Sequence, residues 1–166
     1  LQKLNKLTGL RNMKTMAREM AAFVKEQRRN PRLRDICWHM IFKGKPGTGK
    51  TMCATMVSKI REECGQGNGV FISATRKDII GEHVGQTAPQ IAGLFDKARN
   101  GVLFVDEAGF LLHDQRASYN QEAIKEFVRY MELYQDVTVI FALYPREVEE
   151  WLALDAGLSS RISRIV

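Results

Sequence analysis

The segment Gly44-Lys45-Pro46-Gly47-Thr48-Gly49-Lys50-Thr51 decides the fold of this chain. Its spacing fits the pattern G-x-x-x-x-G-K-[ST], in which glycines allow backbone amides to approach phosphate oxygens closely. The apolar run His39-Met40-Ile41-Phe42 precedes the segment, and a helical stretch from about Lys50 to Cys64 follows it. This order predicts a buried strand, a phosphate-binding loop and a helix whose positive end faces the bound anion.

The residues of this loop have separate expected roles. Lys50 neutralises charge on the β- and γ-phosphates, and the hydroxyl of Thr51 is a ligand for Mg²⁺. The alternative is a glycine-rich turn with an exposed lysine, which the position between strand and helix argues against. The residues expected to contact the nucleotide here are Pro46, Gly47, Thr48, Gly49, Lys50, Thr51 and Met52.

A second candidate feature is the acidic pair Asp106-Glu107, which follows the apolar run Val102-Leu103-Phe104-Val105. A carboxylate at the carboxyl end of a buried strand can hold Mg²⁺, often through water. A second carboxylate beside it can polarise an attacking water molecule. Two acids that merely end a strand are the alternative, and the phosphate-binding loop favours the catalytic interpretation.

The base of the nucleotide is predicted from a missing motif. GTPases typically read guanine through Asn-Lys-x-Asp after a late strand. The nearest match, Asn5-Lys6-Leu7-Thr8, lacks the aspartate and precedes the phosphate-binding loop. We therefore expect the nucleotide to be ATP.

Strands and helices are expected to alternate along the whole chain. An apolar stripe predicts a helix over Arg11 to Arg29, and the pair Asn30-Pro31 ends it. Further strands are expected at 70–72, 102–105, 137–142 and 162–166, with helices at 89–99, 118–134 and 146–152. Ser118 and Gln121 have the spacing of a capping box at the start of one of these helices. The pattern predicts an α/β fold with a five-stranded, mostly parallel sheet and helices on both faces.

Composition is that of one ordinary domain. The chain has 166 residues, of which 45% are hydrophobic and 27% charged. It contains no apolar run of roughly 20 residues, so no membrane insertion is expected. The cysteines Cys37, Cys53 and Cys64 show no CxxC spacing, which favours reduced thiols and a cytoplasmic location.

Charge is distributed unevenly along the sequence. The net charge is +6, and residues 1–50 carry 13 Lys and Arg against 3 Asp and Glu. A basic segment can bind nucleic acid, form a solvated helix face or meet an acidic neighbouring subunit. Because no stacking aromatic residues accompany the basic ones, nucleic acid is the disfavoured alternative.

Two further segments carry weaker signals. Gly81-Glu82-His83-Val84-Gly85-Gln86 has glycines on both sides, which indicates either a mobile loop or a plain surface turn. Gly157-Leu158-Ser159-Ser160-Arg161 ends in an arginine that is either a surface charge or a residue that reaches a neighbour's γ-phosphate.

Taken together, these blocks resemble the AAA+ ATPases. The resemblance rests on Gly47 to Thr51, on Leu103-Phe104-Val105-Asp106-Glu107-Ala108 and on Gly157 to Arg161. Asp78 to Ala88 and Asn120 to Ile124 add to it. The sequence is most similar to the branch that holds stage V sporulation protein K, the red-type Rubisco activase and the type VII secretion ATPase. The blocks keep their order over nearly the whole chain.

The resemblance implies a P-loop NTPase three-layer sandwich that assembles into a ring, usually a hexamer, with nucleotide at the subunit interfaces. Asp106 is then the magnesium acid, Glu107 the catalytic base and Arg161 an arginine finger that acts on the neighbouring subunit. His83-Val84-Gly85 falls on the pore loop that grips a threaded polypeptide. Residues implied to lie near the adenine are Thr8, Gly9 and Leu10.

Two positions depart from the family pattern. His83 stands where a tyrosine or tryptophan is usual, which puts threading in question. At the sensor-1 position the sequence reads Ala142-Leu143-Tyr144, so the Tyr144 hydroxyl replaces a usual polar side chain or Tyr144 is a packed aromatic.

The resemblance also implies a domain division. Residues 1–166 are expected to be the large, nucleotide-binding subdomain, with 1–35 as a helical lead-in. The chain ends soon after Arg161, so we expect the C-terminal helical lid to be absent and the isolated fragment to be weakly active. The leading hypothesis is a ring ATPase that remodels or threads a protein partner. The alternatives are a nucleotide-dependent assembly module with little threading and an AAA+ protein that acts on nucleic acid.

Overall fold

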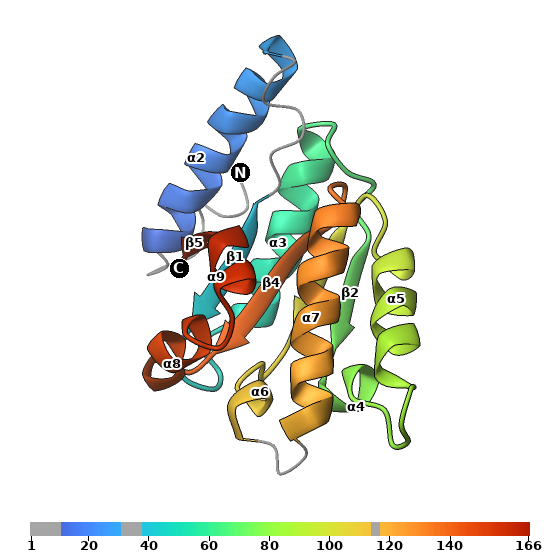
Figure 1. The fold of residues 1–166 in the computed structure, drawn as a ribbon. Helices are drawn as coiled ribbons and strands as arrows, with labels where there is room; N and C mark the ends of the chain where they lie inside the picture. The colour runs from blue at the N-terminus through green and yellow to red at the C-terminus, as the bar shows by residue number, and fades with distance from the viewer. Residues whose placement is uncertain (1–10, 31–37, 114–116) are drawn as a thin grey trace.

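A five-stranded parallel sheet forms the centre of the molecule in a computed structural model that describes residues 11–30, 38–113 and 117–166 (Figure 1). The strand order is β2-β3-β4-β1-β5, and every adjacent pair is parallel. The bounds are β1 His39–Lys43, β2 Phe71–Ala74, β3 Val102–Val105, β4 Thr138–Leu143 and β5 Ile162–Ile165. The expected α/β fold is therefore confirmed.

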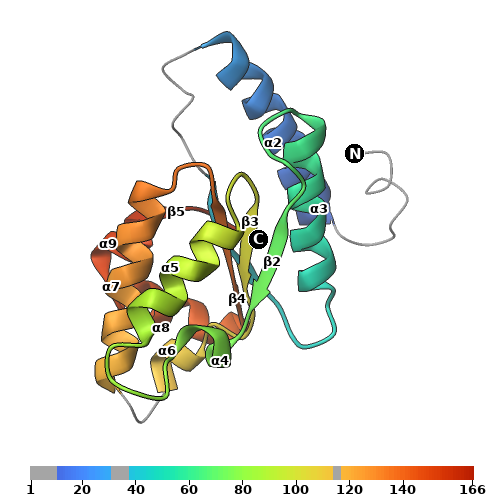
Figure 2. The ribbon, with the colours of Figure 1, turned by 90° about the vertical axis from the view of Figure 1, so that its right-hand side faces the viewer.

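Helices cover both faces of this sheet, as Figure 2 shows from the side. Two long helices lie on one face, namely α2 Arg11–Arg29 and α3 Lys50–Glu63. The other face carries α5 Thr87–Lys97, α7 Ala117–Leu133 and α9 Ala156–Arg161. Shorter elements connect these helices, namely α4 Arg76–Ile79, α6 Phe110–His113, the 3₁₀ turn η2 Pro145–Glu147 and α8 Val148–Leu152.

Two apolar cores result because successive strand residues point to opposite faces of a sheet. In β3, Leu103 and Val105 join the core beneath α5 and α7, whereas Val102 and Phe104 join the core beneath α2 and α3. All four are fully buried. Such burial on both faces explains why the central strands read as continuous apolar runs.

Most expected elements lie within two residues of their predicted bounds. The helix at 11–29 and the strand at 102–105 agree at both ends. Helix α5 begins at Thr87, two residues before the expected start at Pro89. Pro89 fits in the first turn because the amides there have no intrahelical partner, so the missing N–H costs no hydrogen bond. Helix α7 begins at Ala117, so Ser118 lies in its first turn and not at the expected cap position.

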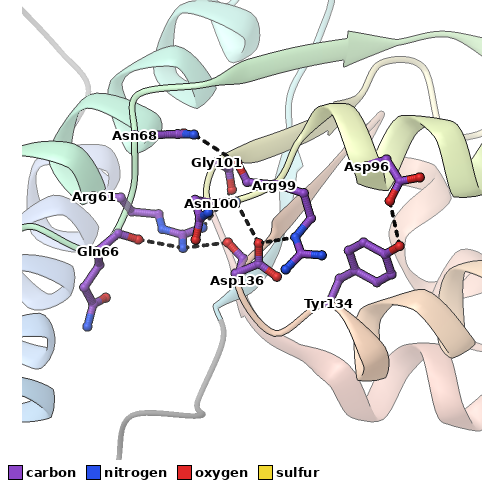
Figure 3. Close-up of polar contacts among 9 residues, drawn as sticks. All are labelled: Arg61, Gln66, Asn68, Asp96, Arg99, Asn100, Gly101, Tyr134 and Asp136. Atoms are coloured by element: carbon purple, nitrogen blue, oxygen red, sulfur yellow. Dashed lines mark hydrogen bonds and ion pairs between the residues drawn. The ribbon is translucent and has the colours of Figure 1, made fainter.

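A polar cluster closes the amino-terminal end of the sheet (Figure 3). Arg61, at the end of α3 and only 7% exposed, donates hydrogen bonds to the carbonyl oxygens of Gly101, Gln66 and Asp136 at 2.8–3.0 Å. The carboxylate of Asp136 accepts hydrogen bonds from the Arg99 guanidinium and from a backbone amide. These contacts fix the end of the sheet opposite the candidate site.

Candidate nucleotide-binding site

The phosphate-binding loop lies between the end of β1 and the start of α3, where the sequence predicted it. The Gly44 amide donates to the carbonyl oxygen of Leu143 at 3.1 Å, which anchors the loop to β4. Gly47 and Gly49 have φ angles of 75° and 83°, in the left-handed region that favours glycine. The loop conformation therefore depends on glycine at these two positions.

Helix α3 begins directly behind this loop. Gly49 occupies the N-cap position, so no side chain at that position competes for the free amides of the first turn. The first-turn residues Lys50, Thr51 and Met52 all line the cleft described below. A helix N-terminus of this kind attracts anions through its amides and its dipole.

Lys50 points its ammonium group across the loop. Its Nζ donates to the carbonyl oxygens of Gly44 at 2.8 Å and Lys45 at 2.9 Å, and lies 5.9 Å from the centre of the Tyr144 ring. The hydroxyl of Thr48 also donates to the Lys45 carbonyl, at 2.8 Å. Neutral carbonyl groups are weaker partners for an ammonium group than phosphate oxygens, so a phosphate can take over these contacts.

A cleft of about 670 Å³ opens at the carboxyl ends of β1, β3 and β4. This volume is within the range of small-molecule sites, and open parallel sheets bind their ligands at this end. The predicted residues that line it are Pro46, Gly47, Thr48, Gly49, Lys50, Thr51, Met52, Asp106, Glu107 and Tyr144. The fold thus brings together three segments that lie far apart in the sequence.

The second residue of the acidic pair, Glu107, has an unusual backbone conformation. The Asp106 amide donates to the carbonyl oxygen of Ala74 on β2, and the Glu107 amide donates to Oδ1 of Asp106 at 2.9 Å. Glu107 has a φ angle of 50°, which is rare for a residue with a side chain and costs about 1–3 kcal/mol. The next amide, that of Ala108, donates to the Ala142 carbonyl at 2.9 Å. The surrounding hydrogen bonds thus hold Glu107 in place despite its strain.

These residues fit a magnesium nucleotide. Mg²⁺ in proteins usually keeps several waters and takes one or two protein oxygens together with phosphate oxygens. Thr51 and Asp106 offer a hydroxyl and a carboxylate in one cleft, beside an uncapped helix N-terminus and Lys50. The arrangement can hold a polyphosphate with its cation and can place Glu107 beside the terminal phosphate.

Other predicted residues lie elsewhere. Arg161 is the last residue of α9, and it is not among the described residues that line this cleft. His83, Val84 and Gly85 form an exposed turn between α4 and α5. Thr8, Gly9 and Leu10 fall outside the described residues, so their expected place near the adenine stays a prediction.

The cleft also contains residues that sequence reasoning missed. Gly109, Phe110 and His113 line it from the segment after the acidic pair, and Glu147 lines it from η2. Glu147 is only 9% exposed. No local pattern distinguishes Glu147 from the exposed acids Glu149 and Glu150 beside it.

Comparison with known proteins identifies the family. Residues 40–165 match the family model described as "ATPase family associated with various cellular activities (AAA)". The chain belongs to the AAA ATPase family. The matched region of this AAA chain includes the phosphate-binding loop, the acidic pair and Arg161.

The branch proposed from the sequence is also confirmed. The AAA chain is 37% identical to stage V sporulation protein K of Bacillus subtilis, with 96% of the chain and 52% of that protein covered. It is 36% identical to protein CbbX of Cereibacter sphaeroides, with 95% and 53% covered. It is 36% identical to the chloroplastic ribulose bisphosphate carboxylase/oxygenase activase of Cyanidioschyzon merolae, with 96% and 57% covered. The AAA chain thus spans about half the length of these relatives.

A solved structure supports the fold independently. A chain from the HORMA:CdnC:Trip13 complex of E. coli MS115-1 matches with a TM-score of 0.70 at 15% identity, covering 99% of this chain and 64% of that one. At this identity the match concerns the fold alone. Within residues 11–30, 38–113 and 117–166, no helix of the AAA chain has the length and apolar character needed to span a bilayer.

Proposed function

We propose that this chain is the ATP-binding and ATP-hydrolysing module of a ring-forming AAA protein that remodels a protein partner. The observation that carries the proposal is one cleft lined by Lys50, Thr51, Asp106, Glu107 and Tyr144. The first four are the residue types that phosphoryl transfer requires, at the carboxyl ends of parallel strands.

Different groups of the chain are proposed to bind the phosphates and the Mg²⁺ ion. The first-turn amides of α3 and the Lys50 ammonium hold the β- and γ-phosphates, which displaces the Lys50 contacts with two backbone carbonyls. Thr51 and Asp106 supply the oxygens that hold Mg²⁺. When bound, Mg²⁺ neutralises charge that develops on the phosphate oxygens.

Glu107 is the proposed general base. Its carboxylate orients water for in-line attack on the γ-phosphorus, and the bond between the γ-phosphorus and the β,γ-bridging oxygen breaks to release ADP and phosphate. Because its left-handed backbone is fixed by neighbouring hydrogen bonds, the carboxylate needs little rearrangement to reach its working position.

Arg161 is proposed to act on the neighbouring subunit. It lies outside the cleft of its own chain, at the end of α9. A guanidinium that reaches the neighbour's γ-phosphate stabilises the charge of the transition state and makes hydrolysis depend on assembly. This role supports a ring, in which every site is completed by the next copy; a hexamer is the proposed size.

The turn at His83-Val84-Gly85 is the proposed contact with a protein partner. Gly85 has a φ angle of 83°, and the His83 amide donates to Oε1 of Gln86 at 3.1 Å. Val84 is 88% exposed, which presents an apolar residue at the tip of a closed turn. A tip of this kind can bind a partner polypeptide weakly. The alternative function is a nucleotide-dependent assembly module that does not thread a polypeptide.

Two further expectations complete the proposal. The chain corresponds to the large, nucleotide-binding subdomain, with residues 1–35 as its lead-in. A cytoplasmic location agrees with Cys53, whose thiol is free and buried. Burial raises the pKa of the Cys53 thiol, which keeps this group protonated and poorly reactive.

Nucleotide trapping in the full-length protein tests the proposal. Glu107→Gln removes the base but leaves the phosphate contacts, so we expect this variant to retain ATP that can be recovered unhydrolysed. The parent protein should release ADP under the same conditions. Equal ADP production by the parent and Glu107→Gln would contradict the assignment of the base.

A further inference from the structure

Glu147 is a buried carboxylate that sits inside the nucleotide cleft without belonging to its phosphate-binding motifs. It is 9% exposed and lies in the 3₁₀ turn η2, directly after β4. Burying a carboxylate is unfavourable unless specific contacts hold it in place. The contacts of Glu147 therefore indicate what this side chain does.

The first contact joins Glu147 to Tyr144. Oε2 of Glu147 accepts a hydrogen bond from the Tyr144 amide at 2.9 Å, and the Glu147 amide donates to the Tyr144 carbonyl at 3.0 Å. This reciprocal pair closes the turn that follows β4. It thereby fixes the backbone of Tyr144, whose ring lies 5.9 Å from the Lys50 ammonium.

The second contact joins Glu147 to the segment after the acidic pair. A Cβ atom placed on Gly109 would lie 2.5 Å from both carboxylate oxygens of Glu147, so any side chain at this position would have to push the carboxylate out of its observed place. The carboxylate thus packs against the backbone of Gly109, two residues beyond Glu107. The indole of Trp151 supports the same turn by donating to the Ala108 carbonyl at 3.3 Å.

We propose that Glu147 is a positioning residue for ATP hydrolysis, which locks the Tyr144 turn against Gly109 and so holds Glu107 in its left-handed conformation. Loss of the carboxylate lets the Glu107 turn relax toward an ordinary backbone conformation. The base then moves away from the attacking water, while the phosphate-binding loop keeps its own contacts. This inference rests on the proposed function, because it concerns the same cleft and the same base.

Two single variants reach this contact from opposite sides. Glu147→Ala deletes the carboxylate, and Gly109→Ala displaces it with a methyl group. We expect each variant to lower kcat by roughly tenfold while the KM for ATP changes by less than about twofold, because the base is misplaced and the phosphate contacts are retained. In the double variant, kcat should fall no further than in the more impaired single variant.

Two control variants separate positioning from general damage. Glu147→Gln keeps an oxygen for the Tyr144 amide, so its kcat should recover to within about threefold of the parent value. Glu150→Ala removes an exposed carboxylate from the neighbouring helix α8 and should leave kcat unchanged. An unchanged kcat in Glu147→Ala, or a double variant whose loss equals the product of the two single losses, would overturn the inference.

Amide hydrogen exchange gives a readout that does not depend on turnover. The Ala108 amide bonds to the Ala142 carbonyl in the structure. Its exchange should accelerate about tenfold in Glu147→Ala and Gly109→Ala, because the turn opens locally more often, and should stay at the parent rate in Glu150→Ala. Unchanged exchange of the Ala108 amide in Glu147→Ala and Gly109→Ala would refute the role of Glu147. A parent protein that binds ATP without hydrolysing it would count against the proposed function alone, because the exchange experiment does not depend on hydrolysis.

Discussion

Arg161 donates through Nη2 to Oε2 of Glu132 at 2.8 Å, which ties the end of α9 to the last turn of α7. Its Nη1 also donates to the Gly157 carbonyl at 2.8 Å. The guanidinium is therefore folded back along its own helix. To reach a neighbouring subunit, it has to exchange the Glu132 contact for a phosphate contact.

The Glu132 contact is thus expected to restrain Arg161. Exposed ion pairs contribute about 0.2–1 kcal/mol, which corresponds to at most about a fivefold change in an equilibrium. Glu132→Gln should therefore raise ATP turnover at a fixed protein concentration by about two- to fivefold. Glu150→Gln, which neutralises an exposed carboxylate on α8, is the control and should leave turnover unchanged. Lower turnover in Glu132→Gln would show that Glu132 supports Arg161 instead.

Lys50 is expected to dominate phosphate binding. A hydrogen bond to a charged group is worth roughly 1.5–3 kcal/mol, so Lys50→Ala should weaken ATP binding at least tenfold or so. Titration with a fluorescent ATP analogue measures this change. Lys59→Ala, at an exposed position on the same helix, should bind as the parent does. Equal affinities of Lys50→Ala and the parent would refute the phosphate-binding assignment.

Arg61 is expected to stabilise the fold without touching the cleft. Arg61→Met leaves the carbonyl oxygens of Gly101 and Asp136 without this donor, which should lower the free energy of unfolding by about 3 kcal/mol. Chemical denaturation measures the loss. Arg99→Met removes a side chain that is 55% exposed and should cost less than about 1 kcal/mol. Equal losses in the two variants would contradict this account.

Acid should destabilise the protein through His39, whose pKa is lowered to about 4. Burial is the main cause, and the charges of Arg61 and Arg161 add to it, while a hydrogen bond with the Met131 backbone opposes it. The Val139 amide donates to Nδ1 of His39 at 3.0 Å, which requires that nitrogen to be unprotonated.

The sign of this pH effect follows from proton binding. Between pH 6.5 and about 4, the unfolded chain binds the proton and the folded chain does not. The His39 contribution is therefore fully present above pH 6.5, declines as the pH falls and levels off below about 4. The total loss is roughly 3 kcal/mol. Unfolding free energies of the parent and of His39→Gln should diverge across this window; parallel pH profiles would contradict the prediction.

The sequence predicted best the features that depend on neighbouring residues. The strand Val102–Val105 follows from four consecutive apolar residues, and the phosphate-binding loop follows from glycine spacing with a strand before it and a helix after it. The short helices α4 and α9 were missed because four to six residues are too few to show helical periodicity.

The missed part of the site depends on contacts between distant segments. Glu147 belongs to the site because the turn after β4 places it against Gly109. No local sequence pattern predicts this contact. The left-handed conformation of Glu107 could not be predicted from the sequence either, since glutamate does not favour it and the surrounding contacts impose it.

Neighbouring copies are proposed to share each ATPase site, and ATP turnover per protomer measured against protein concentration is the decisive measurement. Turnover of the full-length parent should rise with concentration and should be lost in both Glu107→Gln and Arg161→Ala. Mixing these two variants should restore part of it, because Arg161 of one copy and Glu107 of another then meet at one interface. Turnover that is independent of concentration and survives in Arg161→Ala would contradict the shared site.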